Sequence, residues 1–243
     1  MKGKENNNEV TIEYQSEVET FVDIDEGEFP LKVKLTSGKE WECDLIISAT
    51  GVTPNVEIIK DFAPSCKVDD ASGGVVVDTN MRVKGLEGAY AAGDVCSACE
   101  WPPSEHWFQM RLWTQARQMG AFAAKCMTHH SASGGDDLPT DIYFDVFSHM
   151  TEMFGRKLVL LGRYNMQGLS GEEVKDCEML LRMTRKEEYV KVVLKRGRML
   201  GCVLIGETDL EETFENLILN RTDLSYLGEE LLNPDVDIAD YFD

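Results

Sequence analysis

Gly93 and Asp94 are the two adjacent residues of this chain best suited to hold a bulky ligand that carries hydroxyl groups. Glycine has no Cβ, so a ligand can approach the main chain closely there. The aspartate that follows can accept charge-assisted hydrogen bonds from sugar-like hydroxyls. Residues 89–92 are short and apolar, and they predict a strand that ends at this pair. An isolated Gly-Asp pair is, however, also typical of a simple β-turn.

A second candidate for chemistry is the Cys-x-x-Cys motif formed by Cys96 and Cys99. Such a pair could be a redox dithiol, with a nearby helix start lowering the pKa of one thiol, or half of a metal site. Zinc would need a second ligand pair, and the sequence has no other Cys-x-x-Cys; His129 and His130, at a helix end, are a poor substitute. We therefore favour two structural cysteines and expect no metal, and Cys96 and Cys99 remain weak redox candidates.

The element that must position these residues is a helix downstream of Asp94. Ala116, Gly120 and Ala124 recur every four residues, which predicts a stripe of small side chains that another element can approach closely. Gaps beside the stripe are expected to be filled by Met110, Trp113 and Met127. The alternative interpretation is an amphipathic core helix without any role in ligand binding.

Upstream, the pattern predicts strands and a crossover turn. Residues 31–35 alternate apolar and charged side chains, and a Ser-Gly turn leads to residues 40–43, as in a half-exposed hairpin. Residues 45–47 form a continuous apolar run, which suits a strand buried on both faces of a parallel sheet. That run leads to an Ala-Thr-Gly turn containing Thr50 and Gly51, followed about forty residues later by the Gly-Asp pair.

This order and spacing resemble the flavoproteins with two dinucleotide-binding domains, the pyridine nucleotide-disulphide oxidoreductase family. Further matching motifs lie at residues 91–96, 101–103, 115–120 and 201–206, so that the resemblance covers nearly the whole chain after about residue 10. It implies an FAD-dependent oxidoreductase that passes hydride from NAD(P)H to flavin and on to an unidentified acceptor. The cofactor-binding residues that it implies are Gly93, Asp94, Thr50, Gly51, Arg111, Leu112 and Trp113.

In this resemblance, Asp94 holds the ribityl chain and the helix that begins near residues 110–113 points its N-terminus at the isoalloxazine ring. The family's Gly-x-Gly-x-x-Gly loops for FAD and NAD(P)H are absent from the sequence. We therefore interpret the chain as the C-terminal half of such an enzyme, whose status as an enzyme on its own stays open. The alternative is a truncated, non-catalytic interaction or dimerisation module without a complete flavin site.

His149 and His106 are two further candidates for a role near the cofactor. Disulphide reductases of the family carry a His-Pro-Thr motif with a glutamate two residues further on. Here His149 is followed by Met-Thr-Glu, so we expect a structural or exposed residue rather than a catalytic one. His106 is expected in an exposed loop near the helix that faces the cofactor.

The expected fold class is α/β, with incomplete FAD- and NAD(P)-binding domain remnants followed by an α+β C-terminal interface domain. In that domain, four β-type runs and two helices are predicted at residues 157–161, 178–183, 188–195, 199–205, 208–218 and 224–232, with a capping box at the start of the first helix. The expected divisions are a disordered lead 1–9, the end of the NAD(P)-binding domain 10–44, part of the FAD-binding domain 45–130, a linker 131–139 and the interface domain 140–243.

The composition of the chain restricts the kinds of partner it can bind and the cellular compartment in which we expect it. The formal net charge of −20 disfavours direct binding of nucleic acid and favours a basic partner. The sequence has no apolar run of the roughly 20 residues that a membrane helix needs, and its seven cysteines suit a reducing compartment. We therefore expect a cytoplasmic or nuclear protein, with a homodimer or protein partner bound through residues 140–243 and Tyr241 and Phe242 as possible anchors of an acidic tail.

Overall fold

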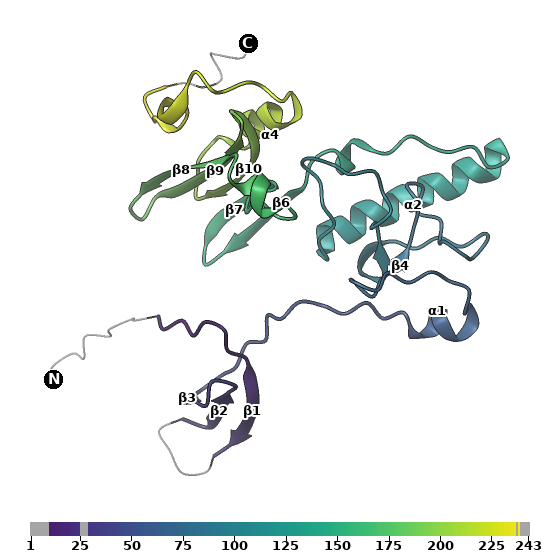
Figure 1. Cartoon of the computed structure of the whole chain (residues 1–243), viewed down its shortest axis with the longest axis horizontal. Helices are drawn as coiled ribbons and strands as arrows, with labels where there is room; N and C mark the ends of the chain where they lie inside the picture. Colours follow the sequence, from purple (N-terminus) through teal and green to yellow (C-terminus); the bar gives the residue numbers. More distant parts are fainter. Residues whose placement is uncertain (1–9, 25–28, 237, 239–243) are drawn as a thin grey trace. The chain divides into compact units, whose positions relative to one another are not determined.

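The computed structural model describes residues 10–24, 29–236 and 238 of the chain (Figure 1). The chain divides into two compact units, residues 1–51 and residues 52–243, and each is described below by itself. Tyr241 and Phe242, proposed as anchors of the tail, lie outside the described residues. Ile238, three residues earlier, is 4% exposed and packs in the core of the second unit.

The first unit is a small antiparallel meander. Its strands pair in the order β1-β2-β3, with the bounds β1 (Val18–Asp23), β2 (Leu31–Leu35) and β3 (Glu40–Cys43). The hairpin predicted from residues 31–43 is confirmed. Gly38 occupies its turn with a φ of 83°, in the left-handed region that favours glycine, and its N–H donates to the Leu35 carbonyl at 2.8 Å.

The predicted buried strand at residues 45–47 is wrong for this chain. Residues 45–50 have no regular structure, and the side chains of Leu45 and Ile47 are 71% and 81% exposed. A strand forms only where a neighbouring strand accepts its hydrogen bonds. Among the described residues, no strand pairs with this segment. The apolar run therefore remains without a partner.

The first part of the second unit surrounds a long helix. Its elements are α1 (Glu57–Phe62), β4 (Val75–Val76), the 3-10 helix η1 (Gly93–Val95), β5 (Cys96–Ser97), α2 (Trp113–Ser133) and the 3-10 helix η2 (Ile142–Phe144). Strands β4 and β5 pair in parallel. A core gathers between them and α2, with Val75, Met81, Met119, Phe122 and Cys126 at most 2% exposed. This core fixes α2 against the segment that carries the Gly-Asp pair.

The strand predicted at residues 89–92 is also wrong. Only an isolated bridge, from Arg82 to Tyr90, forms in this segment, beside a hydrogen bond of 3.1 Å from Ala91 N–H to the Met81 carbonyl. Gly88 and Gly93 on either side have φ values of 72° and 79°. Positive φ interrupts an extended strand, so the segment is a short connection between two turns.

A five-stranded antiparallel sheet forms the C-terminal part of the second unit (Figure 1). Its strand order is β6-β7-β10-β9-β8, with the bounds β6 (Ser148–Met153), β7 (Arg156–Gly162), β8 (Cys177–Thr184), β9 (Glu188–Lys195) and β10 (Arg198–Ile205). The four predicted β-type runs are confirmed as β7 to β10, and the turn between the last two contains Gly197 with a φ of 74°. Strand β6 was not predicted, because it is mostly polar and contains no Val or Ile.

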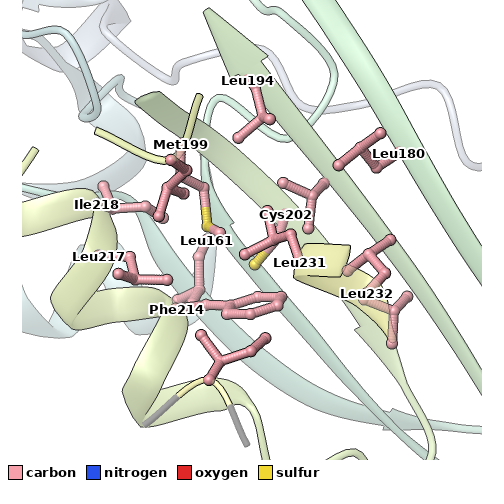
Figure 2. Close-up of a cluster of buried hydrophobic side chains, with 14 of the residues drawn as sticks. Leu161, Leu180, Leu194, Met199, Cys202, Phe214, Leu217, Ile218, Leu231 and Leu232 are labelled. Atoms are coloured by element: carbon pink, nitrogen blue, oxygen red, sulfur yellow. The ribbon is translucent and has the colours of Figure 1, made fainter. Parts of the chain in front are cut away.

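Helix α4 (Glu211–Leu219) and the 3-10 helix η3 (Gly228–Leu232) cover one face of this sheet and contribute to its core. The short helix α3 (Gly171–Val174) has no buried residue. Figure 2 shows Phe214, Leu217 and Ile218 of α4 pointing toward the sheet residues Leu161 and Cys202, and all five are at most 2% exposed. Burial of each large apolar side chain stabilises the fold by roughly 1.5–3 kcal/mol.

Two details of these helices differ from the prediction. The capping box expected at Thr208 and Glu211 does not form, because Asp209 takes a φ of 53° and α4 begins after Leu210, which makes no side-chain cap. A capping box does form at α3, between Ser170 and Glu173. The second predicted helix, residues 224–232, is reduced to η3. The expected fold class is nevertheless confirmed: mixed α/β elements are followed by an antiparallel α+β domain.

Candidate functional site

The Gly93–Asp94 pair forms a tight turn that rests on helix α2. Gly93 is buried, with a φ of 79°, and a Cβ added to it would lie 3.0 Å from the Cβ of Ala116. Glycine is therefore required here by the close approach of the turn to α2. Asp94 is exposed, and no protein group hydrogen-bonds its carboxylate within the described part of the chain. A solvent-facing carboxylate is thus held on a rigid turn.

Arg111 connects this turn to the start of α2. Its Nε donates to the Asp94 carbonyl at 3.1 Å, and its Nη2 donates to the Ser72 carbonyl at 3.0 Å. The guanidinium therefore fixes the backbone of Asp94, while Ala116 packs against Gly93. The structure thus brings together Gly93, Asp94 and Arg111, three of the residues that the sequence singled out.

The N-terminus of α2 is left without a side-chain cap. The helix begins at Trp113 after an extended Leu112 that makes no capping hydrogen bond. Backbone N–H groups in a first helical turn have no partner within the helix, and the helix dipole makes this end positive. The Trp113 side chain is 85% exposed, so the expectation that it fills a core gap is wrong. This helix start can stabilise a negative charge placed beside it.

Gln115 holds the segment before α2 in place. Its side chain is only 4% exposed; its Oε1 accepts from Met110 N–H at 2.8 Å, and its Nε2 donates to the Phe108 carbonyl at 2.9 Å. Gln109 does the same for the loop after Asp94, bonding Ala98 N–H and the Cys96 carbonyl at 2.9 Å each. Sequence reasoning did not single out these positioning glutamines, because their partners are unremarkable backbone groups.

His149 lies against the same helix start. Strand β6 places its Nδ1 3.2 Å from the Oγ1 of Thr114, in the first turn of α2. The side chain is half-buried rather than free in solvent. His149, which was expected to be structural or exposed, therefore contacts the first turn of α2. It does so although His149 and Thr114 are 35 positions apart in the sequence.

The predicted small-residue stripe on α2 is only partly used. Ala116 contacts the Gly93 turn, whereas Gly120 has nothing within 4 Å of an added Cβ, and Ala124 is exposed. Met127, expected in a gap, is 50% exposed. The close approach predicted along the whole stripe is therefore found at Ala116 alone among the described residues.

The two cysteines of the Cys-x-x-Cys motif differ in environment. Cys96 is fully buried, its Sγ lies 3.3 Å from the Gly93 carbonyl, and burial raises the pKa of its thiol to about 11. Cys99 is exposed. A reactive cysteine needs an accessible thiolate with a lowered pKa, so the environment of Cys96 favours a structural thiol.

The remaining predicted positions lie elsewhere. Thr50 and Gly51 end the first unit in a segment without regular structure, where the Thr50 Oγ1 lies 3.4 Å from the Ser48 Oγ. His106, expected in an exposed loop, is 7% exposed, which contradicts that expectation. No cluster of three or more potential metal ligands occurs within the described ranges, and no described helix is long and apolar enough to cross a membrane.

Comparison with known proteins identifies the class to which this fold and turn belong. Residues 1–120 match the model of the pyridine nucleotide-disulphide oxidoreductase family, and residues 168–222 match that of the rubredoxin NAD+ reductase C-terminal domain. The chain belongs to the pyridine nucleotide-disulphide oxidoreductase family.

Its similar relatives include several that share one name, pyridine nucleotide-disulfide oxidoreductase domain-containing protein 1. The protein from Rattus norvegicus is 56% identical over 91% of the chain and 43% of its own length. The proteins from Homo sapiens and Drosophila melanogaster are 53% and 48% identical, over 91% and 96% of the chain and 42% and 48% of their own lengths. The chain thus spans less than half the length of these curated relatives.

Solved structures with the same fold include several that are named as reductases in their titles. An NAD-dependent persulfide reductase from A. fulgidus matches with a TM-score of 0.60 and 17% identity, over 92% of this chain and 39% of that one. Putidaredoxin reductase, in a covalent complex with putidaredoxin, matches with a TM-score of 0.61 and 16% identity, over 89% and 47%. At such identities the likeness shows the fold.

Proposed function

We propose that this chain is the C-terminal part of an FAD-dependent oxidoreductase that takes hydride from NAD(P)H and passes electrons to an acceptor. The observation that carries the proposal is the unpaired, exposed carboxylate of Asp94, on a turn packed against the uncapped start of α2. Family membership supports the same conclusion, since the family is named for pyridine nucleotide-dependent redox chemistry.

The donor set at this turn fits the two ends of a flavin. A ribityl chain offers hydroxyl donors, and Asp94 offers carboxylate oxygens that no described protein group uses. A flavin ring gains electron density on reduction, and the start of α2 offers N–H donors and a positive dipole end. A bound flavin would supply the redox chemistry, because it can accept hydride and pass electrons on.

The chain's own residues bind and orient. Asp94 accepts hydrogen bonds from the ribityl hydroxyls, while Arg111 and Gly93 keep its backbone in place. Thr114 presents its N–H and hydroxyl at the helix start, and His149 fixes the orientation of that hydroxyl through the contact of 3.2 Å. We assign no acid/base residue, and the burial of Cys96 disfavours a thiolate role for it.

A second candidate function is an interaction module that holds no flavin. The exposed apolar run at Leu45 and Ile47 favours it. Residues 140–243 also carry exposed apolar side chains suited to a homodimer or protein partner, such as Met150, Phe154 and Met183 at 57%, 98% and 75% exposure.

Titration of the purified 243-residue chain with FAD distinguishes the two. We expect the flavin fluorescence to be quenched with saturation, and Asp94→Ala to weaken binding about tenfold, as expected for loss of charge-assisted hydrogen bonds. Asp136→Ala, which removes another exposed aspartate, is the control. A folded chain that takes up no FAD contradicts flavin binding and favours the interaction module.

A further inference from the structure

A cavity of about 760 Å³ opens in the second unit and shares no residue with the proposed flavin site. Its size falls within the roughly 300–1,000 Å³ typical of ligand sites. Trp101, Trp107 and Phe144 form an aromatic wall: the two indoles stack with centroids 5.3 Å apart, and Phe144 meets them edge-on. The Trp101 Nε1 donates to the Asp78 carbonyl at 2.9 Å, which fixes that ring.

His106 lines the cavity, and its two ring nitrogens are available for hydrogen bonds. It is 7% exposed, and neither ring nitrogen makes a hydrogen bond of good geometry among the described residues, although the Leu200 backbone lies close enough to raise the pKa of the ring; a Glu105 carboxylate oxygen is 3.7 Å from Nε2. Buried polar atoms are rarely left unpaired. Burial lowers the pKa of this imidazole, so at neutral pH one of its nitrogens is an acceptor.

The orientation of this ring leaves room for such a contact. Both nitrogens are shielded while 8% of the side chain is exposed, so the exposed part is carbon. Rotation of the ring by half a turn exchanges the positions of carbons and nitrogens, and the two orientations have nearly the same shape. A ligand that donates a hydrogen bond would favour the orientation that faces it with a nitrogen.

The charges at the cavity favour a cation. Glu105, Asp137 and Asp145 line it together with one cation, Arg221; Asp137 is already ion-paired with Arg82, which lies outside the lining. Arg221 lies 3.5 Å from Glu105, at the outer limit of a hydrogen bond, and Asp145 is exposed and makes no ion pair within the described ranges. The whole chain carries a net charge of −20, which repels anions.

We propose that this cavity binds an arginine or lysine side chain presented by a basic, extended peptide segment of another protein. A guanidinium or ammonium group carries only donors, which match the Glu105 carboxylate and the neutral His106. A cation is also attracted to the faces of indole rings, and a planar guanidinium can stack on them. Exposed prolines at the rim, Pro102 and Pro103, provide apolar contact for the peptide backbone.

The probe is a capped Gly-Arg-Gly tripeptide, titrated into the full chain while the indole N–H signals of Trp101 and Trp107 are followed by NMR. The isostere with citrulline in place of arginine keeps the shape and removes the charge. We expect saturable shifts of both signals with the arginine peptide and binding at least about tenfold weaker with citrulline, the change expected when a charged hydrogen bond is lost.

Two variants localise the effect. Glu105→Gln removes one carboxylate of the cavity, and Glu178→Gln makes the same change at an exposed position of β8 as the matched control. His106→Phe keeps an aromatic ring and loses no hydrogen bond of good geometry to a described residue, so it is expected to fold. We expect Glu105→Gln and His106→Phe each to weaken binding several-fold or more, and Glu178→Gln to leave it unchanged.

Three results would overturn the proposal. The first is no saturable shift at millimolar peptide, and the second is equal binding of the arginine and citrulline peptides. The third is an equal loss in Glu105→Gln and Glu178→Gln, because that pattern reports a general attraction of a cation to an acidic protein.

Discussion

Replacement of Gly93 by alanine tests whether the turn is held by its close approach to α2. Two terms oppose the added methyl group. A φ of 79° costs a residue with a Cβ about 1–2 kcal/mol. Contact at 3.0 Å with the Ala116 Cβ adds overpacking of about 1–3 kcal/mol, because the partner sits on the backbone of a helix and cannot move alone.

The control for this change is Gly88→Ala. Gly88 has a similar φ of 72°, but nothing lies within 4 Å of an added Cβ, so only the backbone cost of about 1–2 kcal/mol applies. Urea unfolding followed by circular dichroism is the assay. We expect Gly93→Ala to lower the free energy of unfolding by about 1–3 kcal/mol more than Gly88→Ala does.

A second substitution separates contact from strain. Ala116→Gly removes the methyl group that the new side chain meets, so the pair Gly93→Ala with Ala116→Gly should cost less than the sum of the two single changes. Equal losses in Gly93→Ala and Gly88→Ala, together with strict additivity in the double variant, would refute the packing argument.

Three further predictions concern other parts of the second unit. Phe214→Ala should lower the free energy of unfolding by about 3–5 kcal/mol, because it empties a fully buried site of the sheet core. The control Glu212→Ala, at an exposed position of α4, should change this free energy by less than about 1 kcal/mol. Equal losses in the two variants would contradict the observed packing. Burial lowers the pKa of His106 below its usual 6.5, so the unfolded chain takes up a proton first as the pH falls. The free energy of unfolding should therefore decrease below about pH 6.5, and His106→Phe should remove that part of the decrease; an unchanged pH profile in the variant would be evidence against it. Iodoacetamide at pH 8, followed by mass spectrometry, should label the exposed Cys99 well before the buried Cys96, whose pKa is about 11; faster labelling of Cys96 would restore its redox candidacy.

Elements whose partners are close in sequence could be predicted from the sequence. Strands β9 and β10 each contain eight residues with a largely apolar pattern, and a turn that contains glycine joins them. The pattern and the turn therefore both predict a hairpin. Strand β6 escaped prediction because Ser148–Met153 is polar and joins the sheet only through its pairing with β7. A polar edge strand has no period that distinguishes it from a loop.

The candidate site was predicted in part for a similar reason. The residue types and spacing of Gly93 and Asp94 predict a ligand-binding turn. The contact that requires glycine at position 93, however, is made with Ala116 of helix α2. The contact between His149 and Thr114 depends on where β6 joins the sheet, which the sequence does not reveal. The strand predicted at residues 45–47 failed because apolar pattern alone supplies no hydrogen-bonding neighbour.

Affinity for FAD compared with affinity for lumiflavin, which keeps the ring and lacks the ribityl chain, tests most directly whether Asp94 holds that chain. Both are measured on the unmodified chain, on Asp94→Ala and on the control Asp136→Ala. We predict that Asp94→Ala weakens FAD about tenfold and leaves lumiflavin unchanged. Equal affinity of the unmodified chain and Asp94→Ala for FAD, or an equal loss for both flavins, would contradict the account.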